Sequence, residues 1–241
     1  MECFIIQDVK VQALHEWQVS VAEAREIQLK LATRVLTESQ VSSPRLVGGI
    51  DISSPDAEGV AKGAVVVLRY PDLEIVEIEV AQGKVMFPYI PGLLSFREAP
   101  LILAACEKLC NIPDLILVDG QGVAHPRRFG LASHVGLFLD LPTIGCAKSI
   151  LCGQHGPMGE EAGSHADLLD DGQVIGAALR TKSGMKPVYV SVGHKIDLAS
   201  ALQWTLRCCR GHRLPEPTRL AHLAAAGMLN FEASCQKRLF D

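Results

Sequence analysis

The chain has 241 residues, a length that fits one α/β domain spanning residues 1–241. Hydrophobic residues make up 48% and charged residues 21%, which excludes a disordered chain and allows a large core that needs no disulfides. The formal net charge of −4 does not favour nucleic-acid binding, but the position of the basic residues matters more. They gather after position 125 and towards the C-terminus: Arg127, Arg128, Arg207, Arg210, His212, Arg213 and Arg219.

Eight cysteines are present, and none forms a C-x-x-C pair, which argues against a zinc ribbon or a thioredoxin-type site. Most lie among apolar residues, so we expect buried free thiols in a reducing compartment. The N-terminal residues 1–6 lack the basic and apolar regions of a signal peptide, and no apolar run reaches the ~20 residues of a membrane span. We therefore expect a soluble, cytoplasmic monomer without a membrane partner.

The first third of the chain predicts one helix followed by strands. Ser20 and Glu23 form a capping box, and apolar residues then recur at helical spacing from Ala24 to Val35. Three strands are expected next, over residues 45–54, 62–70 and 76–80. Because the links between them are short, these strands should form an antiparallel meander.

Helices and strands alternate in the rest of the chain. The next helix, to residue 110, should begin near Pro100, because proline prefers the first helical position, which would leave Glu98 just before the helix. A short buried strand at Leu115–Val118 ends at Asp119. Further expected elements are a helix at 133–139, a strand at 143–147, a surface loop at 152–171, strands at 174–179 and 188–192, and helices at 197–209 and from about 218. This order resembles the ribonuclease H-like architecture, a mixed sheet flanked by helices.

Two aspartates stand where a charge is costly. Asp51 interrupts an apolar strand, and a buried carboxylate is unfavourable unless it is paired or binds a metal. Asp51 is therefore either a metal ligand or a cap for the turn at residues 53–55. Asp119 stands at a strand's carboxyl end, where ligand sites of α/β sheets collect, or else it is a loop or N-cap residue. A dinucleotide-binding loop is excluded, because G-x-G-x-x-G requires glycine where His125 stands.

Three further polar residues and one segment each have two interpretations. Glu98 either completes a capping box with Ser95 or points elsewhere. By itself, His222 is typical of a packed or surface histidine, and Lys148 of a solvated charge. The segment Pro88–Gly92 holds a tyrosine and an isoleucine between prolines, and it is either a structural turn or a rigid apolar tip that could unstack a base.

Taken together, six segments resemble the endonuclease V (deoxyinosine 3′ endonuclease) family, and they cover most of the chain from about residue 45 to residue 222. Motifs of this length rarely recur by chance, so the functional interpretations above take precedence over the local ones. The segments are Gly49–Asp51, Pro88–Glu98, Asp119–Gly122 continuing to His125–Arg128, Gly130–His134, Pro142–Lys148 and Arg213–Arg219.

The resemblance implies a ribonuclease H-like fold and hydrolysis of the second phosphodiester bond 3′ to deoxyinosine in damaged DNA, with inosine in RNA as the alternative substrate. It implies a Mg²⁺ ion, replaceable by Mn²⁺, on Asp51 and Asp119. Glu98 and His222 would complete the catalytic centre, and Lys148 would lie near the scissile phosphate. Some family members place aspartate at the position of His222. The presence of all five residues argues against a binding protein that has lost its chemistry.

The resemblance also implies how the substrate is held. The segment from Pro88 to Pro91, with Tyr89 and Ile90, would be a wedge behind the displaced base. The implied substrate-binding residues around the hypoxanthine are Gly92, Leu94, Gly120, His125 and Leu131. Gln121 receives no role, because other family members vary at this position.

Overall fold

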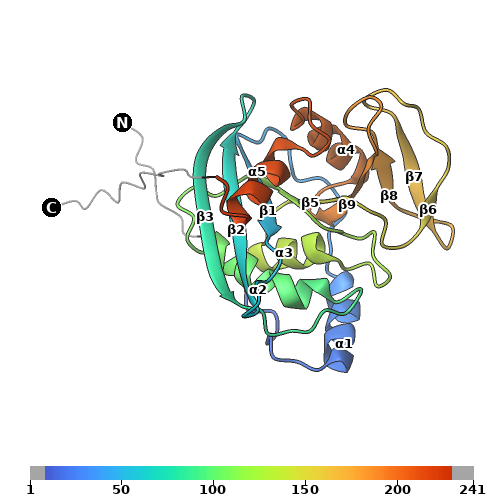
Figure 1. Cartoon of the computed structure of the whole chain (residues 1–241). Coiled ribbons are helices and arrows are strands. Elements are labelled where there is room, and N and C mark those ends of the chain that lie inside the picture. Colours follow the sequence, from blue (N-terminus) through green and yellow to red (C-terminus); the bar gives the residue numbers. More distant parts are fainter. Residues whose placement is uncertain (1–8, 230–241) are drawn as a thin grey trace.

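A nine-stranded mixed sheet forms the centre of the computed structural model, which describes residues 9–229 (Figure 1). Across the sheet the strand order is β3-β2-β1-β4-β5-β9-β8-β7-β6. The strands are β1 (Leu46–Ile52), β2 (Val60–Arg69), β3 (Glu74–Lys84), β4 (Leu115–Val118), β5 (Thr143–Ala147), β6 (Gln154–His155), β7 (His165–Asp170), β8 (Gln173–Leu179) and β9 (Val188–His194). The helices are α1 (Val21–Ala32), α2 (Leu94–Cys106), α3 (Leu131–Leu139), α4 (Leu198–Arg207) and α5 (Glu216–Ala225).

The sheet combines an antiparallel meander with a parallel centre. Strands β1, β2 and β3 pair antiparallel in sequence order, whereas β4 lies parallel to β1 and β5 parallel to β4. Strand β9 then returns antiparallel beside β5. This arrangement confirms the predicted ribonuclease H-like mixed sheet, and it brings the carboxyl ends of β1, β4 and β5 to the same edge.

Alternate residues of the central strands pack against helices on opposite faces. Val65 and Val67 of β2 belong to a core shared with α2 and α3, whereas Val66 and Leu68 belong to a core shared with α4 and α5. Figure 1 shows α5 in front of β1 and β2, with α2 and α3 lower in the view. Because side chains alternate along a strand, both faces of the central strands need apolar residues, which explains their nearly unbroken hydrophobic sequence.

Helix α2 begins earlier than expected. It starts at Leu94, so Pro100 lies inside the helix and Glu98 lies in its second turn, not before it; the helix also ends at Cys106 instead of residue 110. An internal proline costs about 3 kcal/mol. Buried Phe96, with Ala99 and Ile102, offsets that cost, since one large apolar side chain contributes about 1.5–3 kcal/mol when fully buried.

Residues 152–171, expected as a surface loop, contain β6 and β7. Strand β7 pairs with β8 and buries only Leu168, so its sequence carries the charges and glycine-flanked ends typical of a loop. Tertiary pairing with β8 makes it a strand.

Smaller expectations have mixed outcomes. The Ser20–Glu23 capping box is present at the start of α1. Helix α5 begins at Glu216, two residues earlier than expected, with a proline in its first turn. Five cysteines are free thiols, namely Cys106, Cys146, Cys152, Cys208 and Cys209, but Cys110 is disulfide-bonded, so the expectation of free thiols is wrong there. Cys3, Cys235 and the N-terminal segment at residues 1–6 lie outside the described residues.

Between residues 9 and 229, none of the helices combines the length and the apolar character needed to span a membrane.

Candidate active site

Asp51 and Asp119 are neighbours because their strands are parallel neighbours. Ile50 of β1 pairs with Val118 of β4, and the backbone N–H of Asp119 donates to the Ile50 carbonyl oxygen at 3.0 Å. Each aspartate therefore stands at the carboxyl end of its strand, on the same edge of the sheet. Lys148 directly follows β5, the next parallel strand, and this order places it beside Asp119.

Two glycines allow helices to approach this edge closely. A Cβ on Gly49 would lie 1.9 Å from the carbonyl oxygen of Pro217, at the start of α5. A Cβ on Gly63 of β2 would lie 2.6 Å from the backbone of Leu101 in α2. Because only glycine leaves room for such contacts, these positions bring α5 and α2 onto the sheet beside Asp51.

Two polar pairs join the strands to their surroundings. His222 Nδ1 of α5 lies 2.7 Å from Asp51 Oδ2, and the Lys148 ammonium forms an ion pair with Asp119 Oδ2. The two carboxylates are nearly buried, with side chains 9% exposed, whereas the Lys148 side chain is 42% exposed and that of His222 55%. The site thus has a buried acidic floor and a solvent-accessible basic rim.

Burial and neighbouring negative charges raise the pKa of Glu98 and of Asp51. Burial, followed by the charges of Asp51 and Asp119, raises the pKa of Glu98 to about 8. Burial and the charge of Asp119 also raise the pKa of Asp51, against the opposing hydrogen bond from His222. Burial alone would lower the pKa of Lys148, but its hydrogen bond and charge interaction with Asp119 raise it overall. Three carboxyl groups from three elements therefore share one electrostatic environment.

This donor set fits a hard divalent cation, which prefers carboxylate oxygens. A cation would relieve the mutual repulsion that raises the pKa of Glu98 and Asp51. Asp119 Oδ2 is buried and is paired with the Lys148 ammonium, and a cation could share this oxygen. Within residues 9–229, no three His, Cys, Asp or Glu side chains lie close enough together to form a metal site. A cation bound by Asp51 and Asp119 therefore stays a prediction.

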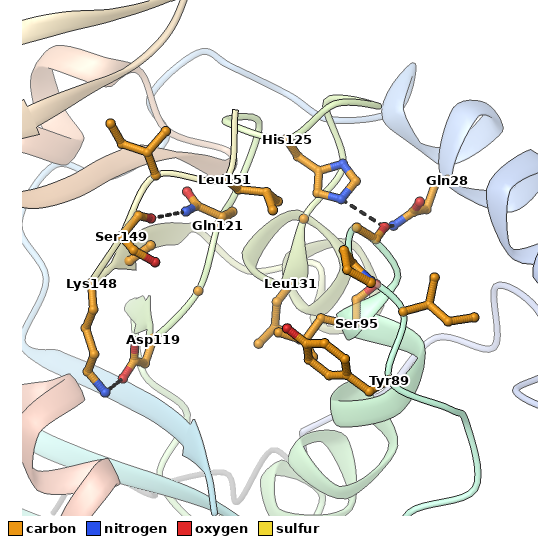
Figure 2. A pocket seen from close by; sticks show the side chains of 18 residues that line it. Gln28, Tyr89, Ser95, Asp119, Gln121, His125, Leu131, Lys148, Ser149 and Leu151 are labelled. Atoms are coloured by element: carbon orange, nitrogen blue, oxygen red, sulfur yellow. Dashed lines mark hydrogen bonds and ion pairs between the residues drawn. The ribbon is translucent and has the colours of Figure 1, made fainter. Parts of the chain in front are cut away.

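A cavity of about 310 Å³ opens beside Asp119 and Lys148. In Figure 2, Asp119 and Lys148 lie on one side of it, and Tyr89 and Ser95 lie on the other. The lining includes most of the residues expected to bind the substrate: Tyr89, Ile90, Pro91, Gly92, Leu94, Gly120, His125 and Leu131. Pro88 is exposed and is not among the lining residues. Tyr89 is 71% exposed, so its ring projects from the segment instead of packing into the fold.

Sequence reasoning missed several lining residues: Gln28, Ser95, Gln121, Gly130, Ala147, Ser149, Ile150 and Leu151. Gln28 had a usable signal, because a polar residue there interrupts the apolar face of α1 between Ala24 and Leu31. Gln121 donates from Nε2 to the Ser149 carbonyl at 2.8 Å and links two walls of the cavity, as Figure 2 shows.

Gly92 is held by three donors. Its carbonyl oxygen accepts from Gln28 Nε2 at 3.1 Å, from His125 Nε2 at 3.0 Å and from Arg127 Nη2 at 2.5 Å. Burial and the charge of Arg127 lower the pKa of His125 to about 4, so its ring is neutral at pH 7. His125 Nδ1 accepts from the Arg127 backbone N–H. Both ring nitrogens of His125 thus form hydrogen bonds within the cavity wall. A direct contact of His125 with the substrate stays a prediction.

Several of the basic residues singled out from the sequence are bound within the fold. Arg128 pairs with Asp170 at 2.8 Å, and Arg219 pairs with Glu216 at 2.6 Å. Arg213 donates to the carbonyl oxygens of Lys148 and Pro187, both at 2.7 Å, and so fixes the chain at the end of β5. These three arginines therefore stabilise the fold around the site, and their charges are at least partly engaged within the protein.

An acidic edge beside a base-sized cavity, on a ribonuclease H-like sheet, defines a nuclease of that fold class. The sequence profile of the Endonuclease V family matches residues 29–223. The chain belongs to the endonuclease V family, and it is accordingly an endonuclease, a hydrolase of phosphodiester bonds.

Individual relatives cover most of the chain. It is 52% identical over 222 residues to Endonuclease V of Dehalococcoides mccartyi, which covers 92% of this chain and 100% of the relative. The crystal structure of Endonuclease V from Streptomyces avermitilis is 44% identical, with a TM-score of 0.84, over 92% of this chain and 97% of that one. Endonuclease V of Ciona intestinalis, 27% identical with a TM-score of 0.74 over 86% and 95% of the chains, was solved with a 23mer DNA containing an inosine followed by a ribo-adenosine.

Proposed function

We propose that this chain is a metal-dependent endonuclease that cleaves the second phosphodiester bond 3′ to deoxyinosine in DNA and so initiates repair of deaminated adenine. The observation that carries the proposal is that one cavity is lined both by Asp119 and Lys148 and by the Tyr89–Gly92 segment. A displaced base and the backbone to be cut would therefore occupy adjacent parts of one site. The inosine-containing DNA bound by the Ciona intestinalis relative supports this substrate.

Asp51 and Asp119, with Glu98 and His222 beside them, would hold Mg²⁺ or Mn²⁺. When bound, such an ion offsets the charge of the phosphate and lowers the pKa of water. The side chains of Lys148 and His222 make the other contributions. Lys148 Nζ, which pairs with Asp119 and stays accessible, can bind a non-bridging phosphate oxygen. His222 keeps Asp51 oriented through its hydrogen bond, and this bond also favours the ionised form of that carboxyl group.

The exposed Tyr89 ring would fill the gap that the displaced base leaves in the stack. An aromatic ring stacked on a base contributes roughly 1–3 kcal/mol. Displacing a base costs a few kcal/mol, and less where its pairing is already weak. A deaminated adenine is therefore easier to displace than a base in a normal base pair. The three donors on Gly92 keep this segment in place and reduce the entropy lost on binding.

Inosine in RNA is a second candidate substrate. The 23mer DNA in the Ciona intestinalis complex contains an inosine followed by a ribo-adenosine, so a 2′-hydroxyl is present after the inosine. Discrimination at a 2′-hydroxyl depends on local contacts to the sugar.

The test is cleavage of labelled strands that differ only at one nucleotide, with deoxyinosine, inosine or deoxyadenosine, with Mg²⁺, with Mn²⁺ and with a chelator. We expect a cut at the second bond 3′ to deoxyinosine, dependent on the cation, and none in the deoxyadenosine strand. Equal cleavage of the deoxyadenosine strand would refute the substrate, and unchanged cleavage with chelator would refute the cation. Faster cleavage of the inosine RNA strand would favour the second candidate.

A further inference from the structure

A chain of hydrogen bonds runs from the cavity wall through the buried His134 to the half-buried His15. Ser95 lines the cavity opposite Asp119, as Figure 2 shows, yet the residue is only 2% exposed. Its Oγ lies 2.9 Å from His134 Nδ1, and His134 Nε2 lies 2.7 Å from His15 Nε2. The chain ends where His15 Nδ1 lies 2.8 Å from the Glu16 carbonyl oxygen.

The proton positions along this chain follow from its far end. A carbonyl oxygen only accepts, so His15 Nδ1 carries a hydrogen. Burial lowers the pKa of His15, and it lowers the pKa of fully buried His134 much further. Each ring is therefore neutral and carries a single N–H. His15 Nε2 must then accept from His134 Nε2, and His134 Nδ1 must accept from the Ser95 hydroxyl.

The Ser95 hydroxyl has one hydrogen, and this hydrogen is committed to His134. Its two lone pairs are what it can offer to a molecule in the cavity. Ser95 is thus a fixed hydrogen-bond acceptor, whereas an isolated serine can rotate to suit either a donor or an acceptor.

We propose that Ser95 is a specificity-determining residue that accepts a hydrogen bond from N1–H of hypoxanthine, and that His134 and His15 are positioning residues that set its polarity. The inference rests on the proposed function, since it assumes that the cavity receives the displaced base. Hypoxanthine carries a hydrogen on N1, whereas adenine has a lone pair there. Adenine in the same orientation would place two acceptors against each other in a buried site, which is unfavourable.

The walls around Ser95 strengthen this selection. Leu131 and the Leu94 side chain line the same cavity, and Phe96 and Phe138 pack against the His15 and His134 rings. An apolar surrounding offers few groups that could rescue a mismatched acceptor, and it also holds the two imidazoles in their planes.

The tautomers can be measured without any substrate. Nitrogen-15 NMR of the histidine-labelled protein should show His134 neutral, with its hydrogen on Nε2 and none on Nδ1. The His15→Gln variant can assign the signals, and its amide oxygen can still accept from His134 Nε2. A His134 ring protonated on Nδ1 would overturn the proposal, whatever the enzyme cleaves.

A cleavage experiment tests the contact itself. It compares strands with deoxyinosine and with the 1-deaza analogue, in which C–H replaces N1–H. We expect the wild-type protein to cleave the analogue roughly 10- to 100-fold less efficiently, as for loss of one buried hydrogen bond. Ser95→Ala should lower kcat/KM for deoxyinosine by a similar factor and bring the ratio between the two strands close to one. Ser95→Ala that slows both strands equally and keeps the ratio would overturn the proposal, because Ser95 would then be only structural.

Two further variants complete the design. Ser133→Ala is the matched control, since Ser133 precedes His134, is fully buried, and its Oγ has no hydrogen-bond partner among the described residues. It should leave the ratio unchanged. His15→Phe removes the acceptor for His134 and should reduce the ratio, whereas His15→Gln should restore it. If the wild-type protein leaves the deoxyinosine strand intact, the proposed function fails. The NMR measurement still decides whether the Ser95 hydroxyl donates to His134 and so offers only acceptor lone pairs to the cavity.

Discussion

His222 Nδ1 lies 2.7 Å from Asp51 Oδ2, although 171 residues separate them in the chain. The contact joins α5 to the carboxyl end of β1, and its close approach depends on Gly49, where a Cβ would collide with Pro217. It also has an electrostatic consequence. Burial and the charge of Asp119 raise the pKa of Asp51, and the hydrogen bond from His222 opposes them.

Replacing His222 should shift the pH dependence of cleavage. The backbone N–H of Ile52, His222 and the charge of Lys148 all lower the pKa of Asp51. His222→Ala removes one of these contacts, so this pKa should rise further and the ionised carboxylate needs a higher pH. The acidic limb of the kcat/KM profile should therefore move to higher pH. At the low-pH end, kcat/KM should fall roughly 10- to 100-fold, as expected for loss of a hydrogen bond to a charged group. His222→Asp should retain cleavage, because it supplies another carboxylate for the cation, but its acidic limb should also move to higher pH, because a negative charge beside Asp51 raises the pKa of Asp51. A His222→Ala profile of unchanged shape would contradict this role for His222.

Asp51→Ala and Asp119→Ala should each abolish cleavage and leave the fold intact. Losing about 4 kcal/mol of barrier lowering corresponds to a rate roughly 1000-fold lower. Circular dichroism and thermal unfolding would check the fold, and Asp72→Asn, at an exposed turn, is the matched acidic control. Full activity in either alanine variant, at purity verified by mass, would remove the proposed ion-binding role.

Tyr89 should act through its ring and not through its hydroxyl. Because the ring projects into solvent beside the cavity, Tyr89→Ala should weaken inosine preference or affinity by roughly 1–3 kcal/mol, whereas Tyr89→Phe should be nearly normal. Binding and cleavage would be measured at one salt concentration, since backbone affinity depends on salt. An inactive Tyr89→Phe would show that the hydroxyl takes part in chemistry, and a fully selective Tyr89→Ala would show that the ring does not act as a wedge.

Glu98 should make the cation-free protein less stable as pH rises. Its pKa is raised from 4.5 to about 8 in the fold by burial and by Asp51 and Asp119, so the folded state holds a proton that the unfolded state releases. This contribution to the free energy of unfolding is complete below pH 4.5 and is lost as pH rises through about 8. Each unit of pKa difference corresponds to about 1.4 kcal/mol, so the total is on the order of a few kcal/mol.

Urea unfolding of the wild type and of Glu98→Gln, in chelator, would measure this effect. The wild type should lose stability between pH 5 and pH 8, and the variant should lose less, because the amide does not ionise. Adding Mg²⁺ should stabilise the wild type more at pH 8 than at pH 5, since the cation competes with the protons. Parallel curves for the two proteins would contradict the assigned environment of Glu98.

The sequence by itself determined the order of most helices and strands along the chain, and it marked Asp51 and Asp119 as candidate acidic site residues. Runs such as Leu115–Val118 are typical of strands buried on both faces, and Asp51 and Asp119 stand out because charges interrupt or follow such runs. These features are local, since they depend on periodicity and on the cost of burying a charge.

Tertiary packing decided the rest. Burial of Phe96 and its neighbours kept Pro100 inside α2 and carried Glu98 into the helix, and pairing with β8 made a strand of a loop-like sequence at residues 165–170. The Ser95–His134–His15 chain has no local signal, because 39 and 119 residues separate its partners. Helix limits, edge strands and buried hydrogen bonds depend on contacts between segments distant in the chain, and the free energy of those contacts can exceed any local preference.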